Sequence, residues 1–188
     1  MTESNGERLV RELLSDPAKF DEAGRAHDLL QCYFAGFPLE TLRELLRSND
    51  AHVQKAAAFL VEELAVRARE LIDDMIPLLS SPDQWTRDDV LQAVAVCAKA
   101  DLIDRYVHVI EVLKSENKLT RELAMMLVSN AQIDQLEAAR RGMQQRSAID
   151  VEGLDLLLSG DRERIDQMLR DPRPLMRCYA AIARERLK

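Results

Sequence analysis

The hydrophobic and polar positions of this chain repeat one pattern, in which an apolar helix end is followed by a polar turn and then by a new amphipathic helix. Leu46–Gln54 aligns in this way with Leu79–Arg87 and with Leu113–Arg121, and the three segments begin 33 and then 34 residues apart. A period of this length predicts helical pairs that stack side by side, rather than a globule built around one central cleft.

The spacing of apolar residues predicts a helix on each side of every turn. Helices are expected over 6–15, from about 20 to 34, over 38–46, 51–65 and 71–79, and in the same alternation to the C-terminus. Pro77 lies inside one of them and predicts a kink there. No alternating apolar run and no Asn-Gly turn indicates a strand. The pattern therefore predicts an all-α fold of about twelve helices in about six antiparallel pairs.

We expect one domain over 1–188, because the repeats leave no room for a linker. A terminal repeat is usually atypical, since its outer face meets water instead of another repeat. The organisation predicted is an N-terminal capping unit, regular repeats, an irregular unit and a C-terminal unit, spanning 1–37, 38–130, 131–158 and 159–188.

Composition limits the classes of partner. The chain has 26 basic and 33 acidic residues, a net charge of −7, which repels phosphate backbones and favours a basic partner over nucleic acid. Its N-terminus lacks the basic and apolar regions of a signal peptide, and no apolar run is long enough to cross a bilayer. Cys32, Cys97 and Cys178 lie far apart inside apolar patterns, which predicts buried free thiols. We expect a cytoplasmic protein that does not associate with membranes.

The repeat resembles the HEAT-like helical repeats of bacterial proteins, which implies a right-handed α-solenoid. A narrower resemblance rests on three segments, Gly36–Arg43, Ala58–Ala65 and Leu78–Pro82. They look like the corresponding parts of small bacterial HEAT-like proteins thought to act as immunity proteins for secreted toxins. The function that this resemblance implies is tight binding of a toxin domain without chemistry.

In stacked helical pairs the second helices form one curved surface, and the outward positions recur from pair to pair. The repeat alignment places nine residues of this chain there or beside it: Lys55, Phe59, Glu62, Trp85, Asp88, Asp89, Gln92, Glu122 and Met126. An acidic rim with interleaved apolar side chains suits a basic protein partner. The alternative is an ordinary solvated face. Trp85 could equally be a plug between helical pairs, since it aligns with His52, Leu119 and Leu175.

The sequence offers no group of residues suited to catalysis. Asp88 and Asp89 are adjacent and diverge by about 100° on a helix, so they cannot form a facing carboxylate pair. His27, His52 and His108 lack metal-ligand spacing, and no catalytic or nucleotide-binding motif is present. We therefore expect no catalytic residue, no metal and no cofactor.

Arginines recur at the same point of three turns, as Arg87, Arg121 and Arg177, one turn into the following helix. A position that repeats in register favours a structural role. We expect each guanidinium to bond to a turn carbonyl or to a carboxylate of a neighbouring pair.

These observations favour a non-enzymatic, monomeric protein-binding module, and the resemblance implies an immunity protein that neutralises a basic bacterial toxin domain. Two alternatives stay open. A HEAT-like DNA glycosylase also uses a concave helical surface, although it needs a basic track for phosphates. A cytoplasmic scaffold or adaptor would have the same sequence features as an immunity protein.

Overall fold

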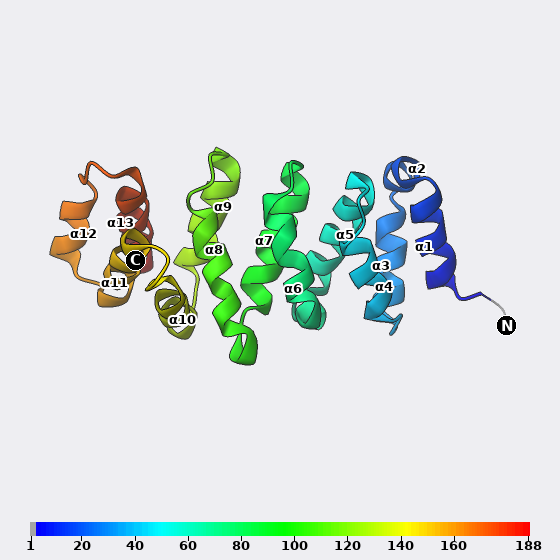
Figure 1. Ribbon diagram of the computed structural model, residues 1–188, viewed down its shortest axis with the longest axis horizontal. Helices are drawn as coiled ribbons and strands as arrows, with labels where there is room; N and C mark the ends of the chain where they lie inside the picture. Colours follow the sequence, from blue (N-terminus) through cyan, green and yellow to red (C-terminus); the bar gives the residue numbers. More distant parts are fainter. Residues whose placement is uncertain (1–2) are drawn as a thin grey trace. The chain divides into compact units, whose positions relative to one another are not determined.

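A computed structural model describes residues 3–188, and these residues form helices joined by short turns, with no strand among them. The prediction of an all-α fold is confirmed. The chain divides into two compact units, Met1–Cys97 and Ala98–Lys188; residues 1 and 2, which belong to the expected capping unit, lie outside the described part. Figure 1 shows the helices of both units. That the two units fold as one domain stays a prediction.

The first unit is built from two layers of helices. Its elements are α1 (Asn5–Ser15), α2 (Pro17–Glu22), α3 (Arg25–Phe34), α4 (Leu39–Leu46), α5 (Ala51–Leu64), η1 (Ala65–Leu71), α6 (Ile72–Met75), η2 (Ile76–Ser80) and α7 (Gln84–Cys97), where η marks a 3₁₀ helix. Helices α3, α5 and α7 contact one another in that order (Figure 1), while α4 packs against α5 and α6 packs against α7. The core between the layers is made of leucine, alanine and valine side chains.

The second unit has a different pattern of contacts. Its elements are η3 (Ala100–Tyr106), α8 (Val107–Val112), α9 (Lys118–Ser129), α10 (Ile133–Met143), α11 (Ala148–Ser159), α12 (Arg162–Met168) and α13 (Pro174–Arg186). Helix α13 packs against both α9 and α11, while α10 packs against α8, η3 and α11. The segment expected to be irregular, 131–158, thus forms α10 and α11, and α13 lies against the helix that precedes them.

The arginines that recur in the turns have the structural role expected of them. Each donates from Nη1 to the carbonyl oxygen six residues earlier: Arg87 to Ser81 at 2.5 Å, Arg121 to Ser115 at 2.6 Å and Arg177 to Asp171 at 2.7 Å. These bonds satisfy a carbonyl that the end of the preceding helix leaves free. The prediction of a bond to a turn carbonyl is confirmed.

The first repeat makes the same bond with a different residue. Gln54 aligns with Arg87, and its Nε2 donates to the carbonyl oxygen of Ser48 at 2.7 Å. An amide therefore replaces a guanidinium at this position, so the bond to the turn does not require a positive charge.

Two of the expected helices are interrupted. The helix expected over about 20 to 34 is wrong as a single element, because Gly24 adopts φ +65 between α2 and α3, a left-handed conformation that glycine tolerates. The helix expected over 71–79 changes from α6 to the 3₁₀ helix η2 at Ile76, next to Pro77. This break is the distortion that a proline without a backbone N–H produces.

Another irregularity follows α5. Ala65 has φ 48 and ψ −127, a region in which a residue with a β-carbon is strained. The thiol of Cys97, at the end of α7, donates to the carbonyl oxygen of Ala65 at 3.3 Å. The neighbouring helix thus helps to hold this strained junction between α5 and η1.

Candidate functional site

Seven of the nine residues expected to bind a partner lie on two adjacent helices of the first unit. Lys55, Phe59 and Glu62 follow one face of α5, and Trp85, Asp88, Asp89 and Gln92 follow one face of α7. Steps of three or four residues place the three α5 residues on one side of that helix. On α7, Asp88 and Asp89 each lie three or four residues from both Trp85 and Gln92, although the two adjacent carboxylates diverge from each other by about 100°. Helices α5 and α7 pack together. All seven side chains are half-buried except Trp85. We call this surface, together with Asp83, the acidic face.

Asp89 is the most perturbed carboxylate of the acidic face. Burial, together with the negative charges of Glu62, Asp88 and Asp83, raises the pKa of Asp89 to about 6, against the opposing effect of Lys55. These mutual effects place the carboxylates of α5 and α7 within electrostatic reach of one another. The acidic face is therefore a region of concentrated negative charge in which water is partly excluded.

The pKa of Glu62, on α5, is raised as well. Burial raises its pKa, and the adjacent Glu63 adds to the effect. Within residues 3–188 neither Glu62 nor Asp89 has an ion pair or a side-chain hydrogen bond. Two half-buried carboxylates thus lie within electrostatic reach of each other, and neither forms an ion pair with the described residues.

Lys55 is the one cation of the acidic face, and its charge is already engaged. Its Nζ donates to Oδ2 of Asp21, on α2, at 2.8 Å. This bond raises the pKa of Lys55, and the charges of Asp83 and Asp89 contribute as well. Asp21 could not be identified from the sequence, because nothing in its local pattern shows that α2 lies against α5.

Asp83 was also missed as part of the charged surface. Its Oδ2 accepts from the backbone nitrogen of Thr86 at 2.7 Å and from the Thr86 hydroxyl at 2.9 Å, which caps the start of α7. Its position three residues before Thr86 could have suggested the helix cap. Capping alone does not indicate that the same carboxylate lies close to Asp89.

Trp85 is 68% exposed, so its interpretation as a plug between helical pairs is wrong. It lies four residues before Asp89, one turn away on the same side of α7. The equivalent residues His52 and Leu119 are exposed as well, Leu119 at 58%. The first turn of these second helices thus carries a solvent-facing position, and at Trp85 that position holds a large aromatic ring beside the carboxylates.

The other two candidates, Glu122 and Met126, belong to α9 in the second unit. Glu122 is exposed and pairs with Lys118 at 3.6 Å, and Met126 is 49% exposed. Both therefore face solvent, as expected. That they form one surface with the acidic face stays a prediction.

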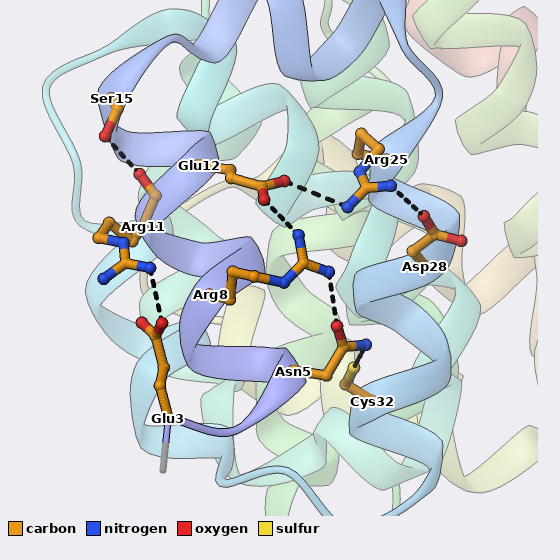
Figure 2. A network of polar contacts seen from close by, with 9 residues as sticks. All are labelled: Glu3, Asn5, Arg8, Arg11, Glu12, Ser15, Arg25, Asp28 and Cys32. Atoms are coloured by element: carbon orange, nitrogen blue, oxygen red, sulfur yellow. Dashed lines mark hydrogen bonds and ion pairs between the residues drawn. The ribbon is translucent and has the colours of Figure 1, made fainter.

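The N-terminal helices carry a second concentration of charge, but its members neutralise one another. Figure 2 shows Arg25 of α3 paired with Glu12 of α1 at 3.2 Å and with Asp28 at 3.1 Å, while Arg8 also pairs with Glu12. Arg11 pairs with Glu3 at 2.6 Å. A cavity of about 430 Å³ between α1, α2 and α3 lies beside this network. The ion pairs tie α1 to α3, and the role of these helices as a capping unit stays a prediction.

Across the part of the chain that the structure describes, no three His, Cys, Asp or Glu side chains are grouped to hold a metal ion. Among residues 3–188 no helix has the length and apolar character needed to cross a membrane. Cys97 is buried as expected, whereas the prediction of burial is wrong for Cys32 and Cys178, which are half-buried; none of the three forms a disulfide.

Comparisons with known proteins describe the fold alone. No protein-family model matches the chain, and no curated protein matches it. Two crystal structures of engineered proteins are similar in fold. One has 18% identity and a TM-score of 0.61, with 98% of this chain and 97% of that chain covered. The other has 17% identity and a TM-score of 0.59, with 97% of this chain and 57% of that chain covered. At such identities the likeness shows a shared helical fold and nothing about binding.

Proposed function

We propose that this chain is a non-enzymatic protein-binding module whose acidic face captures a basic protein partner. The observation that carries the proposal is the pair of half-buried carboxylates Glu62 and Asp89, which face solvent without a cation of their own. Holding such groups together costs stability in the free protein. A lysine or arginine of a partner would relieve their repulsion and gain charge-assisted hydrogen bonds.

Apolar side chains support the same role. Trp85 is exposed one turn before Asp89, and Phe59 lies half-buried on the same face of α5 as Glu62. Tight protein interfaces concentrate their binding energy in a few aromatic anchors surrounded by polar groups. Trp85 and Phe59 would provide such anchors, and the carboxylates would supply orientation and rapid association.

The finer parts of the proposal follow the resemblance given by the sequence. We propose that the helical pairs form a right-handed α-solenoid of HEAT-like hairpins, and the ordered contacts of α3, α5 and α7 support this arrangement. We propose that the partner is a basic toxin domain, that the chain acts as its immunity protein in a bacterial cytoplasm, and that it is a monomer. A DNA glycosylase is less well supported, because the acidic face would repel a phosphate backbone.

The test is a pull-down from the source organism's lysate and secreted fraction with the tagged chain and two matched variants. The first variant, Glu62→Gln with Asp89→Asn, removes two negative charges from the acidic face without adding bulk. The second, Glu44→Gln with Glu70→Gln, removes the same charge from exposed positions of the same unit. We expect one basic protein at stoichiometric amounts with the wild type and with the second variant. The first variant should bind it more weakly by about 2 kcal/mol.

The binding surface and the immunity role can be contradicted by different results. Capture of the same basic protein by the first variant with unchanged affinity would exclude the acidic face as the binding site. If the partner binds there but co-expression of this chain does not relieve any toxicity of the partner, the protein is a scaffold or adaptor and not an immunity protein. Recovery of nucleic acid would favour the DNA glycosylase instead.

A further inference from the structure

The second unit contains a groove between α9 and α13 that the proposed function does not use. Its volume is about 550 Å³. Its apolar lining comes from Leu113, Pro174, Leu175 and Cys178, and its charged lining consists of Lys114 and Arg121. Both charged side chains that line this groove are therefore positive, although the net charge of the chain is −7.

The charge of Lys114 is balanced by a buried carboxylate. Its Nζ donates to Oδ2 of Asp150, a carboxylate with no exposed surface, and the hydroxyl of Tyr179 donates to Oδ1 of Asp150 at 2.9 Å. Asp150 is therefore held between a cation and a hydroxyl inside the second unit. The Lys114 side chain itself stays 42% exposed.

The charge of Arg121, unlike that of Lys114, is not balanced by a carboxylate of the described residues. Its Nη1 donates to the carbonyl oxygen of Ser115 at 2.6 Å, and within residues 3–188 it has no carboxylate partner. Its field reaches into the groove: burial raises the pKa of the Cys178 thiol, while the charges of Arg121 and Arg177 lower it. The guanidinium of Arg121 thus combines a fixed position with donors that remain available to an anion.

We propose that this groove binds an acidic peptide segment, with a glutamate or aspartate on Arg121 and an adjacent apolar side chain on Leu175 and Pro174. The argument is charge complementarity combined with an apolar lining. A free phosphate would use the cation and leave the apolar lining exposed to water. Nucleic acid would meet two lining cations only, against the net negative charge of the chain. The inference does not depend on the acidic face, which lies in the other unit and would bind the opposite charge.

The repeat supplies a variant that separates charge from structure. Arg121→Gln removes the cation, and Gln54 shows that glutamine at the equivalent position keeps the bond to the turn carbonyl. Arg87→Gln makes the same change at an equivalent residue of the first unit and serves as the matched control. Leu175→Glu adds an opposing charge to the groove lining, at a position where the equivalent His52 and Leu119 are exposed.

The probe is a fluorescein-labelled 12-residue peptide with a central Leu-Phe pair flanked by glutamates, followed by fluorescence anisotropy. We expect the wild type and Arg87→Gln to bind it with affinity that falls as salt rises. Arg121→Gln should weaken binding about tenfold, the loss of one charge-assisted contact, and Leu175→Glu should abolish it. Circular dichroism confirms that each variant is folded.

Several results would overturn the proposal. They are equal binding by Arg121→Gln and wild type, binding of the lysine version of the peptide as tightly as the glutamate version, and no binding up to millimolar peptide. Displacement of the peptide by a 12-residue polyglutamate without apolar residues would show that the apolar lining plays no part. Tighter binding of a single-stranded oligonucleotide would assign the groove to nucleic acid.

Discussion

Arg87 Nη1 lies 2.5 Å from the carbonyl oxygen of Ser81, and Gln54 makes the equivalent bond to Ser48 at 2.7 Å. One backbone acceptor is therefore satisfied in the same way by two different side chains. Arg87 also donates to the carbonyl oxygen of Pro82 at 2.9 Å, so its removal leaves two turn carbonyls without this donor. The turn is stabilised by hydrogen bonding, and the positive charge is incidental to it.

This relationship predicts different outcomes for two substitutions of Arg87. Arg87→Gln should keep the bond to Ser81 and change the free energy of unfolding by less than about 0.5 kcal/mol. Arg87→Ala should lower it by about 1 kcal/mol, because a partly buried acceptor loses its donor. Urea unfolding followed by circular dichroism measures both. Equal effects of the two substitutions would mean that the hydrogen bond contributes nothing to stability.

The acidic face predicts that stability depends on pH through Asp89. The pKa of Asp89 is raised to about 6 in the folded protein from an ordinary value of 3.8, so the folded state holds this proton more tightly than the unfolded state. The contribution of Asp89 to stability should therefore increase as pH falls from above 6 to about 4. Asp89→Asn should raise the free energy of unfolding at pH 7.5 by about 1 kcal/mol, after allowance for solvent screening.

The measurement is urea unfolding of wild type and Asp89→Asn at several pH values between 4.5 and 7.5. The difference between the two proteins should shrink toward the acid end, where Asp89 becomes protonated. Glu44→Gln, at an exposed carboxylate of the same unit, provides the control. A difference that stays constant across this range would contradict a raised pKa for Asp89.

The packing of α11 on α13 predicts a large effect at Gly153. A β-carbon at Gly153 would lie 2.1 Å from Cδ2 of Tyr179, a ring that is fully buried and fixed by its bond to Asp150. Gly153→Ala should therefore lower the free energy of unfolding by about 3 kcal/mol. Gly142→Ala is the matched control on α10, where the nearest atom, Cγ2 of Val107, lies 3.3 Å away. It should stay within about 1 kcal/mol of wild type.

Gly153→Ala also tests the expectation of one domain. If both units unfold together, the variant should shift the whole transition measured by circular dichroism at 222 nm. If Met1–Cys97 unfolds by itself, part of the signal should keep its wild-type midpoint. Differential scanning calorimetry distinguishes these cases, because independent units give a van't Hoff enthalpy below the calorimetric enthalpy.

The strained junction after α5 predicts a stabilising substitution. Ala65 has φ 48 and ψ −127, a conformation that glycine adopts without steric cost. Ala65→Gly should therefore raise the melting temperature and increase the free energy of unfolding by about 1 kcal/mol. Ala35, at the same point after α3, has φ −81. Ala35→Gly should lower stability by about 0.5 kcal/mol, since it only adds freedom to the unfolded chain. Equal effects of the two would show that Ala65 carries no strain.

Local chemistry explains which parts of the structure could be predicted. Helix periodicity and turn composition depend on residues within one or two turns of each other, so the all-α fold and the role of Arg87 could be predicted correctly. The interruption at Gly24 could not, because glycine also occurs within helices, and its left-handed conformation depends on how α2 folds back against α3 and α5.

The candidate site shows the same limit. The alignment related the outward residues of α5 and α7, since the repeat itself relates the two helices, and these helices pack together in the structure. That their residues bind a partner stays a prediction. It could not identify Asp21 as the partner of Lys55, because that pair joins residues 34 positions apart in different repeats. Nor could it decide the environment of Trp85, whose aligned residues include both a histidine and leucines. The packing of α13 against α9 likewise depends on contacts between residues far apart in sequence.

The exposure of Trp85 has a practical consequence for optical experiments. It is the single tryptophan of the chain, and its indole is in contact with solvent one turn from Asp89. Its emission should therefore be red-shifted in the free protein and move to shorter wavelength when a partner covers the ring. The molecule thus carries an intrinsic fluorophore at the surface where we propose that binding occurs. Occupancy of that surface can be followed without attaching a label.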